Sequence, residues 1–208
     1  MAWKELSSKC FIYNTQLVNF NDNNIYLRRD ELIMKLNVKK LIINSLLLAL
    51  GLMLHEITPP IFLGMKPDLA LIMLFIVILI NDDYQTALTS GIVCGILTAL
   101  TTGFPNGQVP NIIDKIVTSH AVYLMLLPIR NKLNAQVKVI AVSIIGTIIS
   151  GSVFLGSAAV LAGLPGGASF TALFIGVVLP ATLINAIGGA VLYNIINLSL
   201  KRSNSKVY

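Results

Sequence analysis

Long apolar runs follow one another from about residue 39 to residue 200, and they constrain the fold more than any other feature of this chain. Several of them approach the roughly 20 residues that a helix needs to cross the hydrocarbon core of a bilayer. The 208 residues are 55% hydrophobic and only 12% charged, whereas a soluble domain carries about 25% charged residues. The sequence therefore predicts an all-α integral membrane protein with one polytopic domain.

Six transmembrane segments are expected. The second is predicted to begin at Pro67 and the fourth at Pro110, because proline suits the first position of a helix. The sixth is long enough to tilt or bend, and Pro180 is the expected bend point. The six predicted segments are 39–57, 61–81, 85–102, 110–129, 137–162 and 169–200.

Basic residues flank the apolar runs at three places that share one side of a six-span arrangement. By the positive-inside rule, this side is the cytoplasm, so both termini are predicted to be cytoplasmic. The acidic connection 81–85 falls on the same side and departs from the pattern, although acidic residues weigh little in this rule. Because the basic residues flank apolar runs, the net charge of +6 indicates a membrane and no nucleic acid. The flanking residues are Lys35, Lys39, Lys40, Arg130, Lys132, Lys138, Lys201, Arg202 and Lys206.

Residues 1–33 are polar and aperiodic, without the apolar core of a cleavable signal peptide. Residues 34–40 read Met-Lys-Leu-Asn-Val-Lys-Lys, which is typical of the start of a bacterial membrane protein. We therefore expect residues 1–33 to be a dispensable or wrongly assigned extension of a transport domain over 34–208. The alternative is a short amphipathic segment on the membrane surface.

The connection between the third and fourth segments is the most informative polar stretch. It reads Thr101-Thr102-Gly103-Phe104-Pro105-Asn106-Gly107-Gln108-Val109-Pro110-Asn111-Ile112-Ile113-Asp114-Lys115. Because both flanks are long enough to cross a bilayer, these polar groups are expected at or just below one membrane surface. Ionisable groups there are costly and usually functional. The sequence therefore predicts a site for a polar solute at this end of the protein.

Asn111, Asp114 and Lys115 fall at positions i, i+3 and i+4 of a helix that starts at Pro110, so they share one face, which Thr118 continues. The helix N-terminus adds free N–H groups and partial positive charge. Lys115 with those amides suits a carboxylate and Asp114 suits an ammonium, a combination that fits a zwitterion such as an amino acid. The alternative is an internal Asp–Lys ion pair that only stabilises the fold.

Other outer connections offer further candidates. Lys66 is a candidate carboxylate contact, or it extends to the lipid headgroups, while Asp68 either contacts the solute or only favours the helix dipole. Glu56 is a site wall or an ion-pair partner of Lys66 or Lys115. Phe62 and Phe104 either form an apolar slot or anchor the protein at the membrane interface. The connection 162–168 is either a lid or a plain turn.

Small residues predict close helix contacts, and enzyme signatures are absent. Ala87, Gly91, Gly95 and Ala99 form a small-xxx-small stripe that favours packing inside the monomer. Ser45 and Ala49 form a shorter pair that faces a neighbouring helix or a partner protein. There is no phosphate-binding glycine-lysine loop, no nucleophile motif and no disulfide or metal spacing. We therefore expect neither an enzyme nor a cofactor or metal.

Two motifs carry a resemblance to a known family. Gly64-Met65-Lys66-Pro67-Asp68 and the stretch Thr101–Lys115 resemble the bacterial tryptophan-transport proteins of the TrpP type, over roughly residues 34–200. That family is similar to the substrate-binding S components of energy-coupling-factor (ECF) transporters, which are six-helix proteins that work with a transmembrane partner and two ATPases. In those proteins an Ala-xxx-Ala pair on the first helix contacts the transmembrane partner, and this sequence has Ser45 and Ala49 there.

The resemblance implies tryptophan uptake across a bacterial cytoplasmic membrane by an S-component-like bundle in contact with membrane lipid. The lysines would bind the carboxylate, the aspartates the ammonium, the amides would add hydrogen bonds, and the phenylalanines would hold the indole. Two other readings stay open: a stand-alone proton-coupled carrier of tryptophan or another apolar amino acid, and a membrane scaffold without a solute. The predicted binding residues are Glu56, Phe62, Lys66, Asp68, Phe104, Gln108, Asn111, Asp114 and Lys115.

Overall fold

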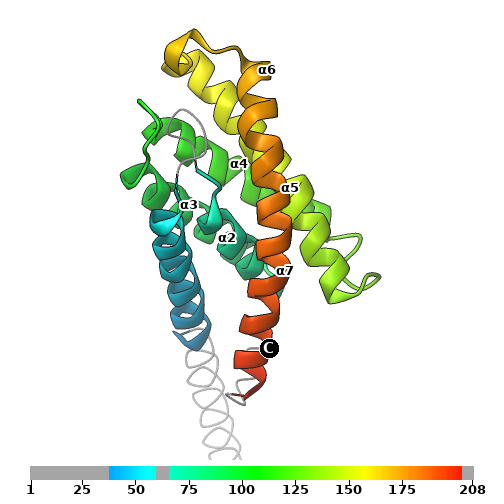
Figure 1. Cartoon of the computed structure of the whole chain (residues 1–208). Helices are drawn as coiled ribbons and strands as arrows, with labels where there is room; N and C mark the ends of the chain where they lie inside the picture. Colours follow the sequence, from blue (N-terminus) through cyan, green and yellow to red (C-terminus); the bar gives the residue numbers. More distant parts are fainter. Residues whose placement is uncertain (1–37, 60–65, 203–208) are drawn as a thin grey trace, which may run out of the picture. The chain divides into compact units, whose positions relative to one another are not determined.

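A computed structural model describes residues 38–59 and 66–202 (Figure 1). The chain divides into two compact units, residues 1–43 with 207–208 and residues Asn44–Lys206. Of the first unit only residues 38–43 are described, and they are helical. The predicted extension over 1–33 and Phe62 lie outside the described residues. All contacts reported below belong to the second unit.

The described residues form helices and short connections, without a strand among them. Three helices are long and apolar enough to cross a membrane: Val38–Ile57, Ala135–Leu161 and Phe170–Arg202. Their outward faces carry large exposed apolar side chains such as Leu46, Val160 and Ile187, as expected of lipid-facing surfaces. The elements after the first helix are α2 (Leu69–Ile80), α3 (Tyr84–Leu100), α4 (Gln108–Leu126), α5 (Ala135–Leu161), the 3₁₀ turn η1 (Pro165–Gly167), α6 (Phe170–Leu173), the π turn η2 (Phe174–Val178) and α7 (Leu179–Arg202). The last three together make up the long helix Phe170–Arg202.

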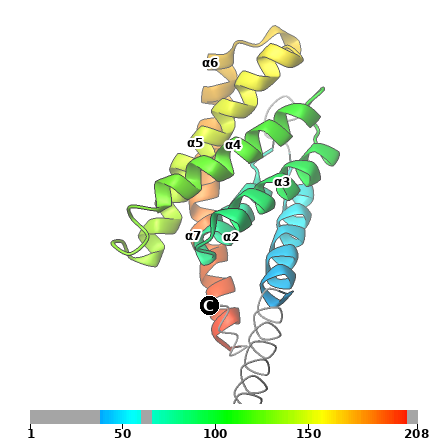
Figure 2. The same cartoon turned by 180° about the vertical axis from the view of Figure 1, so that it is seen from behind.

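The second predicted segment, 61–81, is too long and begins too early. Helix α2 has 12 residues and begins after Asp68, not at Pro67. At 1.5 Å per residue it is about 18 Å long, which is less than the roughly 30 Å of a bilayer core. Every residue from Ala70 to Ile78 is buried, and α2 contacts α3, α4, α5 and α7, which surround it in Figures 1 and 2. An apolar run of this length fits a buried core helix better than a membrane span.

Within the described part of Asn44–Lys206, the chain crosses six times between two ends. One end holds the connection after α2 and the connection between α4 and α5, and we call it the Arg130 end. The other end holds a polar pocket, and we call it the pocket end. The contacts that gather the Arg130 end are Asn81 with Asn44, Arg130 with Asn81 and Asp82, Tyr123 with Asp82 and Tyr84, Lys138 with Arg130, and Gln136 with Asn194.

The acidic connection after α2 departs from the charge pattern, and a basic residue forms an ion pair with one of its aspartates. Arg130 forms an ion pair with Asp82, and its guanidinium donates to the backbone oxygens of Asn81 at 2.9 Å and Ile78 at 3.4 Å. The last carbonyls of a helix lack partners within the helix, and Arg130 supplies one. The acidic and basic connections therefore lie at the same end, as predicted.

Small residues let α3 and α4 pack closely, as the stripe on α3 predicted. Gly91 and Gly95 are buried, and a Cβ added at Gly91 would lie 2.9 Å from the backbone oxygen of Lys115. One at Gly95 would lie 3.1 Å from the Cα of Ile112. Larger side chains would push α4, and with it Lys115, away from α3.

The last long helix contains a π turn, Phe174–Val178, which ends two residues before Pro180. The bend predicted at Pro180 stays a prediction. Proline lacks the N–H that would bond four residues back, and its ring crowds that carbonyl. A π turn accommodates both effects without ending the helix.

Two glycine substitutions test the α3–α4 contact. We expect Gly91→Ala to destabilise the protein by about 1–3 kcal/mol through overpacking. Gly156→Ala on α5 is the matched control, because a Cβ added there would meet nothing within 4 Å, and alanine there favours the helix by up to about 1 kcal/mol. Unfolding of both variants in detergent, followed by circular dichroism, measures the difference. Equal stability of the two variants would contradict the close packing.

Candidate functional site

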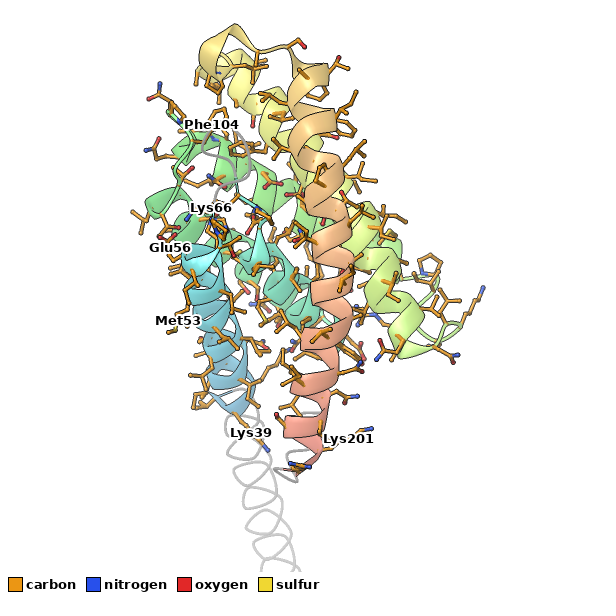
Figure 3. All side chains as sticks on the ribbon, in the orientation of Figure 1. Lys39, Met53, Glu56, Lys66, Phe104 and Lys201 are labelled. Atoms are coloured by element: carbon orange, nitrogen blue, oxygen red, sulfur yellow. The ribbon has the colours of Figure 1, made fainter. Side chains whose placement is uncertain are left out.

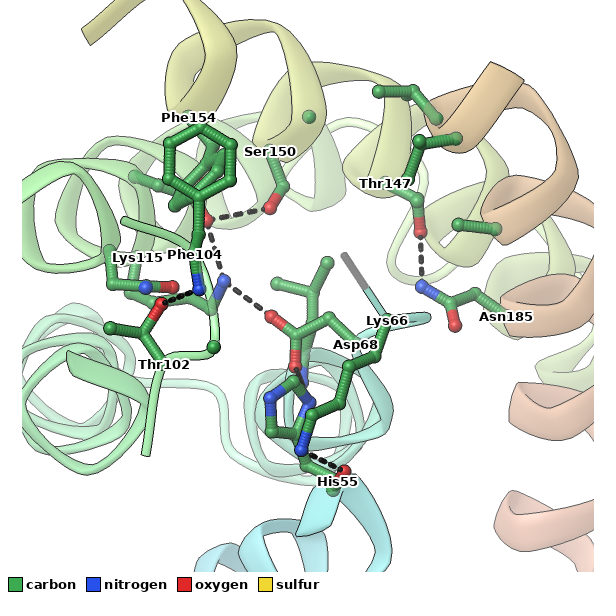
Figure 4. Close-up of a pocket in the computed structure, with 18 residues that line it drawn as sticks. His55, Lys66, Asp68, Thr102, Phe104, Lys115, Thr147, Ser150, Phe154 and Asn185 are labelled. Carbon is green, nitrogen blue, oxygen red and sulfur yellow. Dashed lines mark hydrogen bonds and ion pairs between the residues drawn. The ribbon is translucent and has the colours of Figure 1, made fainter. Parts of the chain in front are cut away.

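A pocket opens at the pocket end between the helix Val38–Ile57, the residues before α2, the connection after α3, and helices α4, α5 and α7 (Figure 4). It encloses about 690 Å³ of empty space, a figure that includes space open to the surroundings. Its polar lining consists of His55, Lys66, Asp68, Thr102, Asn111, Asp114, Lys115, Thr147, Ser150 and Asn185, and its apolar lining includes Leu71, Phe104, Phe154, Val177, Val178 and Ala181.

The ammonium of Lys115 lies between two carboxylates. Its Nζ is 2.5 Å from Asp68 Oδ2 and 2.5 Å from Asp114 Oδ2. The Lys115 and Asp114 side chains are 2% and 1% exposed, so both charges are removed from solvent. A buried charge is tolerated only when it is paired and hydrogen-bonded, and this arrangement meets that condition.

Asp68 uses its two carboxylate oxygens for different purposes. Oδ1 accepts the backbone N–H of Leu71 at 3.0 Å and so caps α2, while Oδ2 contacts Lys115. His55 Nδ1 also lies 3.3 Å from Oδ1. The two readings that the sequence left open for Asp68, helix stabilisation and a place in the site, are therefore compatible.

Asp114 is held by hydroxyl groups as well as by Lys115. Thr118 donates to Oδ1 and Ser150 donates to Oδ2, each at 2.8 Å. Thr118 is one turn further along α4, as the predicted polar face required, whereas Ser150 belongs to α5. The contact from Ser150 ties α5 to the charged cluster on α4.

The charges within the Lys115 cluster are unequal in number. Lys115 faces two carboxylates, so these three groups sum to −1 with both aspartates ionised. Lys66 and Glu56 form a looser pair, with Nζ 3.5 Å from Oε1, which is one of the partners predicted for Glu56. Lys66 Nζ also lies 3.5 Å from the backbone oxygen of His55. These long contacts leave Lys66 more capacity for a new partner than Lys115 has.

Phe104 forms part of the pocket wall and is not exposed at the surface. It is 4% exposed and packs in an apolar cluster with Leu155, Leu173 and Val178. Its ring meets that of Phe154 edge-on, with centroids 5.1 Å apart. Leu164 and Ala168 of the connection 162–168 pack against this cluster, a contact that fits either a lid or a plain turn. Figure 3 shows Phe104 and Lys66 toward the same end of the described unit.

The structure gathers most of the predicted binding residues but not all. Gln108 is exposed and lies outside the pocket lining, and Glu56 is at its margin. Helix α4 begins at Gln108, not at Pro110, and the backbone N–H of Asn111 already bonds Gly107 at 3.0 Å. The free helix N–H groups predicted beside Lys115 are therefore not there. The lining residues brought together as predicted are Lys66, Asp68, Phe104, Asn111, Asp114 and Lys115.

Sequence reasoning missed the pocket residues on the fifth and sixth segments. Thr147, Ser150 and Phe154 lie on one face of α5, at helical spacing, and Asn185 is an amide between apolar neighbours, Ile184 and Ala186, on α7. Polar residues inside apolar helices tend to face other helices or a cavity. That signal was present in the sequence, but it does not say which residues share a site.

A membrane-embedded helical protein with a charged, partly aromatic pocket is organised as a solute-binding transport protein. The chain belongs to the tryptophan transporter TrpP family, whose model matches residues 37–201, and which is a family of transporters, not of enzymes. It is 57% identical over 168 residues to a "Probable tryptophan transport protein" of Clostridium acetobutylicum, covering 81% of this chain and 97% of the relative.

Two further relatives carry the same description. One, from Clostridium perfringens, is 44% identical over 177 residues, and one, from Bacillus subtilis, is 46% identical over 169 residues. Each comparison covers 81% of this chain and 96% of the relative. No solved structure matches the chain.

Two substitutions separate the roles of Asp68. Asp68→Ser keeps an oxygen that can cap α2 but removes the charge, whereas Asp68→Ala removes both. We expect Asp68→Ala to be less stable than Asp68→Ser by about 1 kcal/mol, the usual value of an N-cap. Both variants also lose the ion pair between Asp68 and Lys115. Lys115 still has Asp114 as a partner, so this loss should destabilise the protein by less than the roughly 3–5 kcal/mol expected when a buried pair is broken outright.

Chemical unfolding in detergent measures this difference. If the two variants unfold at the same denaturant concentration, the capping role assigned to Asp68 is wrong.

Proposed function

We propose that this chain binds tryptophan in the pocket and mediates its uptake across the bacterial cytoplasmic membrane. The observation that carries this proposal is the cluster of Lys115, Asp68 and Asp114 beside Lys66, in a pocket with an aromatic wall. The cluster offers groups of both signs to a zwitterion, and the wall offers contacts to a ring. The three relatives described as probable tryptophan transport proteins support tryptophan as the solute over other apolar amino acids.

The excess negative charge of the cluster favours the ammonium of the amino acid near Asp68 and Asp114. Lys66 is the favoured carboxylate contact, because its present contacts are both 3.5 Å long. Lys115 then has a different task from the one the sequence suggested, since it holds the two aspartates together. Asn111 adds a polar group from α4, and Phe104 with Phe154 contacts the indole.

The energy source for uptake is proposed to lie in other chains, as in ECF transporters. The sequence contains no phosphate-binding glycine-lysine loop, so ATP-driven transport would need two ATPase subunits and a transmembrane component. Ser45 and Ala49 are exposed on the helix Val38–Ile57, which leaves this small-residue pair open to a membrane partner. We also propose that the Arg130 end is cytoplasmic and that both termini lie on that side.

A proton-coupled carrier is the second candidate, and one observation favours it. Asp68 and Asp114 share a single ammonium, so the cluster has one negative charge that a proton can neutralise. Buried carboxylates of this kind serve as proton sites in transporters.

Tryptophan binding is the first test. Detergent-purified protein should bind labelled tryptophan saturably, and Asp114→Ala or Lys115→Ala should weaken binding at least about tenfold. Asp114→Ala removes one of the two carboxylates proposed for the ammonium, and Lys115→Ala leaves Asp68 and Asp114 without the cation they share. Lys132→Ala is the matched control, because this lysine is exposed in the connection between α4 and α5. Equilibrium dialysis or calorimetry provides the measurement. The absence of saturable binding by the unaltered protein would favour the scaffold reading.

Reconstitution separates the two transport mechanisms. Proteoliposomes with this chain alone should not accumulate tryptophan under a proton gradient, whereas co-reconstitution with an ECF transmembrane component and its ATPases should give ATP-dependent uptake. Ala49→Trp should abolish that uptake without changing tryptophan binding, since it obstructs the proposed partner contact outside the pocket. Gradient-driven accumulation by the chain alone would refute the ECF mechanism and establish the carrier.

A further inference from the structure

Asn185 on α7 is a polar group of the pocket that has no contact with the charged cluster. Its side chain is wholly buried, and it lines the pocket across from Lys115 (Figure 4). Its Nδ2 donates to Thr147 Oγ1 at 3.1 Å, while its Oδ1 has no hydrogen-bond partner among the residues that the structure describes. Buried acceptors are nearly always satisfied, so this oxygen marks a place where a bound molecule supplies a donor.

We infer that Asn185 Oδ1 accepts a hydrogen bond from the indole N–H of bound tryptophan, and so selects this ring over others. The inference rests on the proposed function. An indole N–H is neutral and only donates, which matches a neutral amide oxygen with Val178 and Ala181 among its fellow lining residues. An ammonium would lose its hydration there without gaining an opposite charge, and the carboxylates that suit it lie elsewhere in the pocket.

The spacing along α5 fits a ligand that reaches both places. Thr147 contacts Asn185, and Ser150, three residues later, contacts Asp114. Positions i and i+3 are neighbours on one helix face, about one turn or 5 Å apart. The Asn185 amide and the charged cluster therefore contact α5 about one helical turn apart. This spacing suits a molecule with an amino-acid head at one end, an apolar body, and a ring N–H at the other end.

Thr147 is a positioning residue in this arrangement. It accepts from Asn185 Nδ2, and in this arrangement Oδ1 is the amide atom left for the ligand. A side chain such as phenylalanine, without a ring donor, would leave Oδ1 buried and unsatisfied. Sites built to bond a polar group discriminate strongly against analogues that lack it, so Asn185 accounts for selection that an apolar slot alone would not provide.

The test compares tryptophan with 3-(3-benzothienyl)alanine, in which sulfur replaces the ring N–H with little change in shape. The unaltered protein should bind tryptophan about 10- to 100-fold more tightly than the analogue, which corresponds to an unmade bond to a buried acceptor. In Asn185→Leu, which is similar in size but apolar, the two dissociation constants should come within about threefold of each other. Thr147→Val should reduce the preference in the same direction.

The ratio of the two affinities distinguishes the outcomes. If Asn185→Leu weakens both ligands equally and keeps the preference, Asn185 is structural and the inference is overturned. Equal binding of the two ligands by the unaltered protein would overturn it too, without any variant that has to fold. If the unaltered protein binds no tryptophan, the proposed function itself fails, and that result is distinct from tryptophan binding without the preference.

Discussion

The contact of one ammonium with two carboxylates organises the pocket end of this protein. Lys115 belongs to α4, Asp114 is its neighbour in sequence, and Asp68 comes from the residues before α2. Charges buried this deeply are unfavourable unless all of them find partners. The position of α2 relative to α4 is therefore constrained by electrostatics as well as by packing, and Ser150 extends the same constraint to α5.

Helix α2 begins at a residue of this cluster. It is 12 residues long, it is buried along most of its length, and Asp68 provides its cap. The residue that caps α2 therefore also belongs to the pocket, and α2 in turn contacts α3, α4, α5 and α7. Under the proposed function, a ligand that engages Asp68 would act on the start of a helix at the centre of the described bundle.

The sequence predicted what depends on local spacing and missed what depends on tertiary contacts. The shared face of Asp114, Lys115 and Thr118 follows from helical periodicity, and the small-residue stripe of α3 from its four-residue repeat. The contact between Asp68 and Lys115, and the place of Asn185 in the same pocket, require knowledge of which helices are neighbours. The length of α2 was misjudged because apolar composition alone does not separate a core helix from a span.

The sequence left two roles open for the Asp114–Lys115 pair, contact with a solute and stabilisation of the fold. Different residues of the pocket suit these two roles. Asp114 and Lys115 are almost completely buried, and Asp114 is satisfied by partners on α4 and α5, so their charges mainly hold the wall together. Asp68 and Lys66 keep 19% and 15% of their side chains exposed. Under the proposed function, these two groups are therefore the ones most available to an amino acid, while the inner pair holds the geometry of the site.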